Sequence, residues 1–187
     1  MDSMSVHVLR LGHRPSRDKR VSTHLLLAAR TFGASGGIYT GDKDPSLEES
    51  IQNVVSEWGG EFSLEYSDSW RKSIKSWKGK IVHLTMYGLP FKDVIGEIRE
   101  DTSDLLVVVG GAKVPGEVYG LVEWNVGVSD QPHSEVSALG VFLYELFDRE
   151  LVDFMDGRLK VVPQAHGKLV EERSREDLSP AKENVLE

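Results

Sequence analysis

Leu105-Leu106-Val107-Val108-Val109 (LLVVV, residues 105–109) is the stretch that decides the fold, and a pair of glycines follows it. Five consecutive apolar residues at strand length are typical of a strand buried on both faces, which occurs in the middle of parallel sheets covered by helices. On either side of this run, apolar stretches of strand length alternate with stretches of helical period. The alternation predicts an α/β fold with a mostly parallel sheet flanked by helices.

Outward from the central run, the chain divides into short strands and amphipathic helices. The other predicted strands are Ser5–Leu11, Gly37–Thr40, Phe62–Tyr66, Lys80–Leu84, Asn125–Val128 and Arg158–Val162. The predicted helices are Lys19–Ala34, Pro45–Trp58, Ser69–Trp77, Asp93–Arg99, Glu117–Val122 and Gln131–Asp148. We expect a single domain over residues 1–170 and a polar tail over 171–187, whose low apolar content predicts flexibility.

The composition excludes several classes of protein. The chain has 187 residues, which suits one domain, and it has no cysteine for a disulfide scaffold, a metal site or a nucleophile. Its six histidines show no i,i+4 spacing, so we expect no metal site. No apolar run approaches the ~20 residues of a membrane span, and the N-terminus has no signal-peptide core, so we expect a cytoplasmic protein without membrane contact. The net charge of −8 argues weakly against nucleic acid as a partner.

The segment Arg10–Arg20, RLGHRPSRDKR, concentrates positive charge directly after a predicted strand. Its five basic residues and one acid sum to +4. Ligands of open α/β sheets sit at the carboxyl ends of strands, and arginine forks suit phosphate oxygens. The segment therefore predicts an anion-binding loop, with a solvated basic loop as the alternative on charge alone.

A second basic stretch, Trp70–Lys80 (WRKSIKSWKGK), contains two tryptophans and no acid. Basic residues interleaved with aromatics can hold a nucleic-acid backbone and stack on bases. The spacing of Trp70, Ile74 and Trp77 also fits an amphipathic helix that buries these three residues. We favour the helix for the tryptophans, while the lysines could still attract phosphate.

The glycine pair lies in Val107–Pro115, VVVGGAKVP. A buried strand that runs into two glycines lets the backbone approach a ligand closely. The stretch matches neither a P-loop nor a dinucleotide-binding fingerprint, and a plain turn is the simpler interpretation of these residues alone.

The segment Asn125–Leu139, NVGVSDQPHSEVSAL, carries the start of the last predicted helix. Ser129 or Asp130 can cap that helix, Pro132 suits its first turn, and Glu135 suits the helix dipole. Capping leaves three clustered polar residues unexplained: Gln131, His133 and Ser134.

Together, four strings resemble the SPOUT superfamily of RNA methyltransferases. They are VLRLGHRPSRDKRVSTH (8–24), VHLTMYG (82–88), VVGGAKVPGEVYGL (108–121) and NVGVSDQPHSEVSAL (125–139). The resemblance spans roughly residues 6–168 and is closest to archaeal enzymes that act on the T-loop of tRNA. Two positions depart from the family pattern: Ala112 stands where an acidic residue is expected, and Glu123-Trp124 where Asp-Tyr is expected.

The resemblance implies a fold with a deep C-terminal trefoil knot and a homodimeric enzyme. Its implied activity is methyl transfer from S-adenosylmethionine to the ribose 2′-hydroxyl of cytidine 56 in tRNA. In the implied dimer, the last helix lies at the interface, where Phe142, Leu143 and Phe147 add apolar side chains. The basic segment of one subunit completes the donor site of the other subunit. A methyltransferase for a different RNA and a non-catalytic nucleotide-binding or anion-binding module are the alternatives.

The resemblance also implies roles for individual residues. Three loops after strands would hold the donor, with these expected contacts: Leu84, Gly110, Gly111, Ala112, Lys113, Val114, Val128, Ser129, Asp130, Gln131, Pro132, His133 and Ser134. The catalytic arginine would be Arg20, supported by Arg17, with Arg30 as the rival. His133 and Ser134 could instead assist loss of the hydroxyl proton. From charge and resemblance together, we expect these RNA contacts: Arg10, Arg14, Arg71, Lys72 and Lys75.

Overall fold

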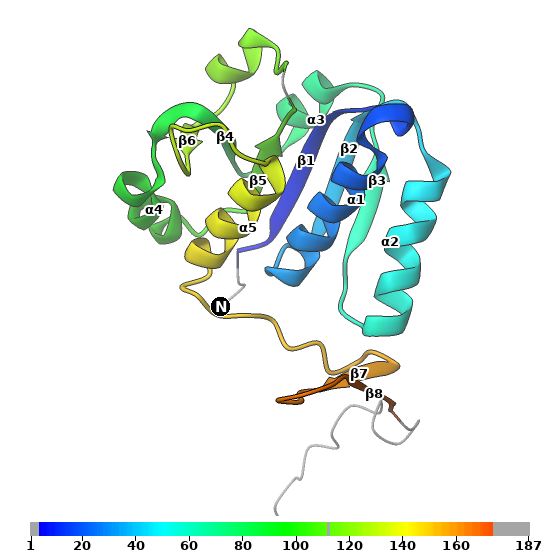
Figure 1. Cartoon of the computed structure of the whole chain (residues 1–187). Coiled ribbons are helices and arrows are strands. Elements are labelled where there is room, and N and C mark those ends of the chain that lie inside the picture. The colour runs from blue at the N-terminus through cyan, green and yellow to red at the C-terminus, as the bar shows by residue number, and fades with distance from the viewer. Residues whose placement is uncertain (1–3, 112, 174–187) are drawn as a thin grey trace, which may run out of the picture.

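A six-stranded sheet forms the centre of the computed structural model, which describes residues 4–111 and 113–173. Its order is β3-β2-β1-β5-β4-β6, and every neighbouring pair is parallel (Figure 1). The apolar run is β5, Leu105–Val109, and all five of its residues are buried between β1, Val6–His13, and β4, Lys80–Pro90. The mostly parallel α/β sheet expected from the alternation pattern is confirmed.

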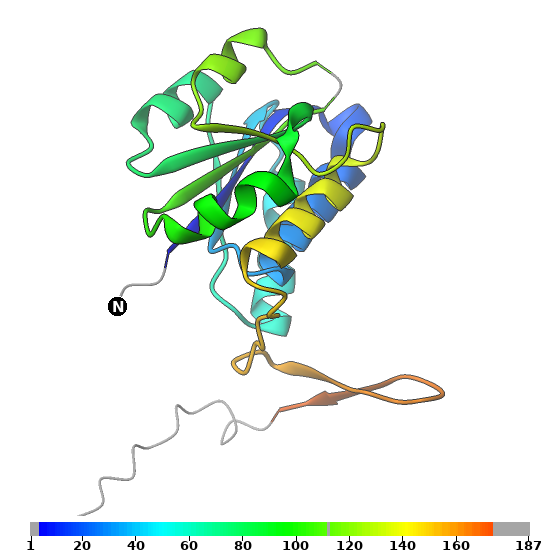
Figure 2. The same cartoon turned by 90° about the vertical axis from the view of Figure 1, so that its left-hand side faces the viewer.

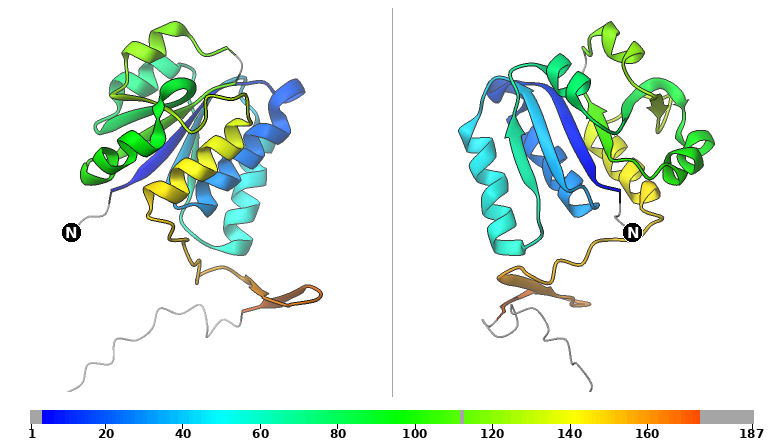
Figure 3. Two further views of the ribbon diagram at one scale, coloured as in Figure 1. Left: turned by 60° about the vertical axis from the view of Figure 1, so that its left-hand side comes forward. Right: turned by 180° about the vertical axis from the view of Figure 1, so that it is seen from behind.

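Helices cover both faces of the sheet, but unequally. The remaining strands of the sheet are β2 (Gly36–Gly41), β3 (Ser63–Tyr66) and β6 (Trp124–Gly127). The helices are α1 (Pro15–Thr31), α2 (Pro45–Trp58), α3 (Trp70–Ser76), α4 (Phe91–Glu100), α5 (Glu135–Leu146) and the short 3-10 helix η1 (Gly116–Gly120). Side chains of α1, α2, α4 and α5 join the larger apolar core on one face, where α5 lies along α1 (Figure 2). The other face, seen from behind in Figure 3, packs against α3 and η1.

The register of the strands aligns residues of four of them at the same level. Arg10 of β1 and Leu84 of β4 both pair with Val109 of β5, and Leu84 also pairs with Val126 of β6. Because all four strands run in the same direction, the connections that follow them leave from one end of the sheet. This end is where ligands of open α/β sheets bind.

The basic segment Arg10–Arg20 is not a loop, which corrects the sequence-based expectation. Helix α1 begins at Pro15 rather than at Lys19, and Arg14 is its N-cap. The fixed φ of proline suits the first helical position, where its missing N–H is not needed. The segment is therefore divided between the end of β1 and the first turns of α1.

Helix α5 begins later than expected. Ser134 is its N-cap, and the Ser134 hydroxyl accepts a hydrogen bond from the backbone N–H of Val136 at 3.2 Å. The Ser129 hydroxyl accepts instead from the N–H of Gln131 at 3.1 Å, which forms a local turn. The predicted cap at Ser129 or Asp130, and the place of Pro132 in the first turn, were therefore wrong.

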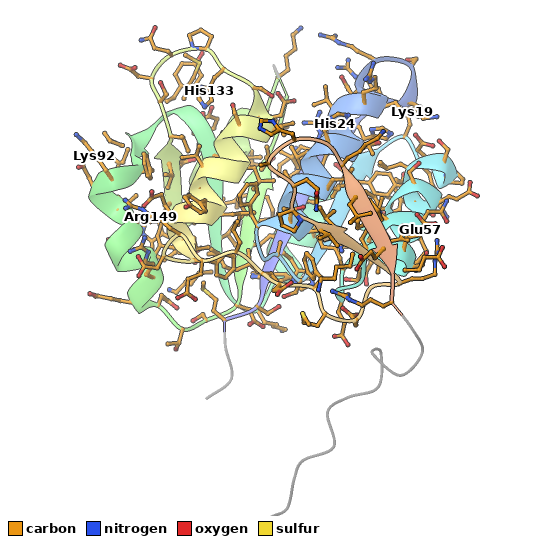
Figure 4. The ribbon with its side chains drawn as sticks, turned by 60° about the horizontal axis from the view of Figure 1, so that its bottom comes forward. Lys19, His24, Glu57, Lys92, His133 and Arg149 are labelled. Carbon is orange, nitrogen blue, oxygen red and sulfur yellow. The ribbon has the colours of Figure 1, made fainter. Side chains whose placement is uncertain are left out.

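A two-stranded antiparallel hairpin, β7 (Leu159–Val162) and β8 (Leu169–Glu172), follows the six-stranded sheet (Figure 1). Arg158, directly before this hairpin, pairs with Glu57 at the end of α2, and the two nearest atoms are 3.1 Å apart. Figure 4 shows Glu57 close to the hairpin. Strand β8 was not predicted, because its four residues are all exposed and show no apolar alternation. The predicted boundary between residues 170 and 171 falls inside β8, and the tail from residue 174 onward lies outside the described residues. In the described part of the chain, no helix is both long and apolar enough to cross a membrane.

Candidate functional site

A cavity of about 700 Å³ opens at the end of the sheet where β4, β5 and β6 finish. Three connections form its wall: the turn after Leu84, the glycine loop after Val109, and the segment between β6 and α5. A fourth contribution comes from Tyr119 of η1. The residues that line it are His83, Leu84, Thr85, Met86, Tyr87, Gly110, Gly111, Lys113, Val114, Tyr119, Val126, Val128, Pro132, His133, Ser134, Glu135 and Ala138.

The wall at β4 is shaped by an irregularity in the sheet. Val126 of β6 pairs with Leu84 and again with Leu89, so the residues between these two leave the regular ladder. A Cβ atom at Gly88 would lie 2.5 Å from backbone atoms of Asn125 and Val126, and only glycine permits this close approach. The predicted strand end at Leu84 therefore marks the bulge, beyond which β4 continues to Pro90.

A buried histidine at the cavity has a defined tautomer. The side-chain amide of Asn125 donates to the Tyr119 carbonyl at 2.9 Å, so its oxygen faces Nδ1 of His83, also at 2.9 Å. His83 Nδ1 therefore carries the proton and donates it. Burial lowers the pKa of His83, although the hydrogen bond to Asn125 acts in the opposite direction. Nε2 of His83 is left as an acceptor without a partner among the described residues.

The glycine loop follows β5 closely over the cavity. A Cβ atom at Gly110 would lie 2.2 Å from a methyl carbon of Val114, so a larger residue there must displace the Val114 side chain. A Cβ atom at Gly111 would lie 3.8 Å from the guanidinium nitrogens of Arg10. Ala112, which was expected to contact the donor, lies outside the described residues.

The segment between β6 and α5 contributes only part of its predicted contacts. Pro132, His133 and Ser134 line the cavity, whereas Ser129, Asp130 and Gln131 do not. These last three residues bond to one another in the turn, where the Gln131 amide donates to Asp130 at 3.1 Å. Nδ1 of His133 donates to the Gln131 carbonyl at 2.6 Å, which fixes the ring orientation.

Arg10 is buried beside the cavity, which corrects its predicted role in RNA binding. It is 2% exposed, because it continues the inward-facing side of β1 that begins with Val6 and Val8. Its Nη2 lies 3.4 Å from Oε1 of Glu135, and its Nε donates to the Ser22 hydroxyl at 3.4 Å. Burial lowers the pKa of Arg10, against the opposing effect of Glu135.

On the side of Arg10 away from Glu135, buried polar side chains form a hydrogen-bonded series. The Ser22 hydroxyl is 2.8 Å from Nδ1 of His13, and Nε2 of His13 donates to Asp44 at 3.2 Å. Asp44 caps α2, and hydrogen bonds from Ser46 and His13 hold the pKa of Asp44 below its usual value. The chain of contacts ties the ends of β1, α1 and α2 together.

The other basic residues of the first segment are exposed on α1 and do not line the cavity. Arg14 pairs with Asp18 at 3.1 Å, and Arg17 lies 4.0 Å from the same carboxylate. Arg20 has no ion-pair partner among the residues described here. Figure 4 shows neighbouring Lys19 and the cavity residue His133 well apart on the molecule.

Arg30, the rival for the catalytic role, serves a structural purpose instead. It lies near the C-terminal end of α1, about 24 Å along the helix from Arg14 at 1.5 Å per residue. Its Nη2 donates to the Gly59 carbonyl, and its guanidinium lies 4.1 Å from the centre of the Phe154 ring. The prediction of a catalytic Arg30 was wrong, because the side chain faces the segment that leads to the hairpin.

The second basic stretch is the predicted amphipathic helix. Trp70 of α3 and Trp77, which directly follows the helix, pack against the apolar cluster around buried Ile74. Lys72 and Lys75 are exposed, while Arg71 pairs with Glu117 of η1 at 2.7 Å. The tryptophans are thus engaged in packing, and the two lysines are available to a partner.

Sequence reasoning missed several residues of the wall. His83, Tyr119 and Ala138 were not singled out, and Glu135 was explained only through the helix dipole. The sequence did contain a signal for His83 and Glu135, because each is next to a residue predicted to contact the donor, Leu84 and Ser134 respectively. Their inward direction depends on strand register and helix start, which local sequence leaves open.

Comparisons with known proteins find similar sequences over most of the chain. Residues 58–171 match a family model described as tRNA ribose 2′-O-methyltransferase, aTrm56. The chain is 54% identical over 174 residues to the tRNA (cytidine(56)-2′-O)-methyltransferase of Methanothermobacter thermautotrophicus, covering 90% of this chain and 97% of the relative. Its counterpart in Methanopyrus kandleri is 53% identical over 169 residues, covering 88% and 94%.

Solved structures are similar in fold. A TrmH/SpoU tRNA modifying enzyme of A. aeolicus has a TM-score of 0.57 at 14% identity, covering 79% of this chain and 76% of that chain. The SpoU methyltransferase AviRb of Streptomyces viridochromogenes, in complex with the cofactor AdoMet, has a TM-score of 0.55 at 17% identity. That comparison covers 80% of this chain but only 59% of the AviRb chain.

Proposed function

Because the chain belongs to the family of tRNA ribose 2′-O-methyltransferases described as aTrm56, we propose that it methylates the ribose 2′-hydroxyl of cytidine 56 in tRNA. S-adenosylmethionine is the proposed donor. The identity of 54% to a relative matched over 97% of its length carries the proposal. A tRNA substrate also makes the cytoplasm the expected location. The trefoil knot that the resemblance implies stays a prediction.

The cavity fits S-adenosylmethionine in size and chemistry. About 700 Å³ lies within the usual range for small-molecule sites. Leu84, Val126 and Val128 form an apolar wall for an adenine ring, and the backbone at Gly110 and Gly111 is accessible for hydrogen bonds. When bound, the donor supplies a methyl group already activated on a positively charged sulfur, so the protein has to align an oxygen with it and assist loss of one proton. Alignment of this kind can contribute ~7–11 kcal/mol.

We propose a homodimer in which Arg20 and Arg17 of one subunit complete the cavity of the other. These arginines do not line the cavity of their own chain, yet they are exposed and available. The expected apolar interface needs correction, since Phe142 and Leu143 are fully buried in the core. Val141 and Tyr144 are the exposed apolar residues of α5, and they offer the helix face for a second subunit.

Within that dimer, Arg20 is the proposed catalytic residue. Arginine remains protonated, so its guanidinium would orient the 2′-hydroxyl and stabilise the negative charge that develops on the oxygen. His133, whose ring is held by the Gln131 carbonyl at the cavity, is the alternative group for the hydroxyl proton.

The tRNA would be held by positive patches on an otherwise acidic protein. The chain carries a net charge of −8, so affinity must come from local groups. Five basic side chains are exposed to solvent: Arg14, Arg17 and Arg20 at the start of α1, and Lys72 and Lys75 on α3. Two separated patches suit the extended phosphate backbone of a folded RNA.

Methyl transfer to unmodified tRNA tests the proposed function directly. We expect labelled donor to modify a tRNA transcript at cytidine 56, and expect no label on a matched tRNA carrying 2′-deoxycytidine at that position. Equal labelling of both transcripts would refute the assignment to this hydroxyl. Donor binding without transfer to any RNA would favour a non-catalytic module.

A further inference from the structure

Glu135 occupies a particular place in the cavity wall. It is the first residue of α5, directly after the Ser134 cap, and its side chain is 27% exposed. Among the described residues that line the cavity, it is the only carboxylate, and Lys113 is the only lysine or arginine. A carboxylate in a half-enclosed wall exerts a stronger field than one in open water.

The Glu135 carboxylate is held from behind by a buried cation. Nη2 of Arg10 lies 3.4 Å from its Oε1, and Arg10 does not itself line the cavity. Arg10 is 2% exposed, and its Nε donates a hydrogen bond to the Ser22 hydroxyl. Its Nη1 has no hydrogen-bond partner among the described residues. The ion pair is therefore oriented with its negative end toward the cavity.

This orientation matters because the methyl donor and its product differ in charge. S-adenosylmethionine carries a positive sulfonium, and S-adenosylhomocysteine has lost both the methyl group and that charge. We propose that Glu135, positioned by Arg10, favours binding of the positively charged donor over the neutral sulfur of the product. The proposal rests on the proposed function, since it requires that the cavity hold the donor. Product that binds less tightly than donor leaves sooner, which assists turnover.

The test compares two dissociation constants in the full-length protein. Isothermal titration calorimetry would measure S-adenosylmethionine and S-adenosylhomocysteine against wild type and Glu135→Gln. We expect the variant to lose affinity for the donor by about 10-fold, while affinity for the product changes by less than about 2-fold. Glu135→Asp, which keeps the charge, should retain most of the preference. Arg10→Lys, which keeps the buried charge but not the planar fork, should lose less preference than Glu135→Gln.

Glu100→Gln is the matched control, because it removes the same charge at an exposed position of α4 that does not line the cavity. It should leave both affinities unchanged. An equal loss for donor and product in Glu135→Gln would mean a purely structural role and overturn the proposal. Unchanged affinities with a slower transfer step at saturating donor and tRNA would place the carboxylate at the acceptor hydroxyl instead, which also overturns it.

A cavity that does not hold the donor gives a different result. Wild-type protein would then bind neither S-adenosylmethionine nor S-adenosylhomocysteine, and both proposals would fall together. Binding of both ligands by wild type with no change of preference in Glu135→Gln removes only the role of Glu135. A thermal melting curve for each variant verifies that the folded state is compared throughout.

Discussion

The central guanidinium carbon of Arg30 lies over the Phe154 ring, 4.1 Å from the ring centre. The same side chain donates to the Gly59 carbonyl, and Gly60 donates its N–H to Asp156 at 2.8 Å. These contacts connect the end of α1, the turn after α2 and the segment before the hairpin. Arg30 thus links parts of the chain that are distant in sequence, at the end of α1 away from the cavity.

Arg30→Ala should therefore destabilise the protein without impairing the chemistry. Loss of a buried charged hydrogen bond and a cation–π contact should lower the free energy of unfolding by about 2 kcal/mol. Urea unfolding measures this change, with Phe154→Ala as the matched variant on the other side of the contact. A strongly reduced methyl-transfer rate in fully folded Arg30→Ala would return this residue to the list of catalytic candidates.

Gly110→Val should weaken donor binding. The new side chain would meet Val114, whose methyl carbon lies 2.2 Å from the position of a Cβ at residue 110, and would push it within the cavity wall. We expect at least a ~10-fold loss of S-adenosylmethionine affinity, the scale of a pocket contact. Calorimetry with a melting curve distinguishes this loss from unfolding. Gly116→Val, where a Cβ would meet no atom within 4 Å, is the control.

Arg20→Ala should reduce methyl transfer by ~100-fold or more, about the effect of removing one preorganised donor to the transition state. Donor affinity should be unchanged. Mixing the Arg20→Ala and Gly110→Val proteins tests whether the site is shared between subunits. In a dimer with one subunit of each kind, one cavity combines an intact Gly110 from the first subunit with an intact Arg20 from the second. Statistical subunit exchange should restore about a quarter of the active sites. No recovery after verified exchange would contradict a site built from two subunits.

Lys72→Ala and Lys75→Ala should weaken tRNA binding and leave turnover at saturating tRNA unchanged. Each lost phosphate contact should lower the slope of log affinity against log salt by about one. Lys92→Ala is the matched control, since Lys92 is exposed on α4 rather than on α3 (Figure 4). Equal slopes for all three variants would exclude α3 from the tRNA interface.

The stability of the protein should fall as the pH decreases below the ordinary histidine pKa of 6.5. Burial lowers the pKa of His83, so in this range the unfolded chain binds more protons than the folded one. The free energy of unfolding then rises with pH, and its slope levels off below the lowered folded pKa. His83→Gln should reduce the slope measured by urea unfolding between pH 5 and pH 7. Burial also lowers the pKa of His7, which contributes a slope of the same sign, so a slope unaffected by His83→Gln would assign the effect to His7.

Some elements could be predicted to the residue. Helix α2 runs from Pro45 to Trp58 as expected, because the proline start and the glycine stop are local signals, and the structure adds Asp44 as its cap. Strand β5 also has its predicted bounds, since five apolar residues allow no other alignment of a buried strand. The four strings that resemble the SPOUT superfamily supplied the family, which the comparisons then established.

The candidate site was predictable in its loops but not in its side-chain directions. The stretches after β4, β5 and β6 were selected because parallel strands end on one side of a sheet. Whether Gln131 or Glu135 faces the cavity depends on where α5 begins, and the Ser134 hydrogen bond decides that over the alternatives at Ser129 and Asp130.

The sequence by itself determined the alternation of strands and helices, the class of fold and the segments that surround the cavity, because these depend on local periodicity and capping. Only the tertiary structure decided which basic residues are exposed to solvent and so available for RNA binding. Arg10 and Arg20 belong to one basic segment, yet Arg10 is buried and Arg20 is exposed. The difference in exposure between Arg10 and Arg20 has two causes. Arg10 lies on the inward face of β1, and it pairs with the carboxylate of Glu135, more than a hundred residues later in the sequence. A long-range contact of this kind leaves no trace in the local pattern of residues.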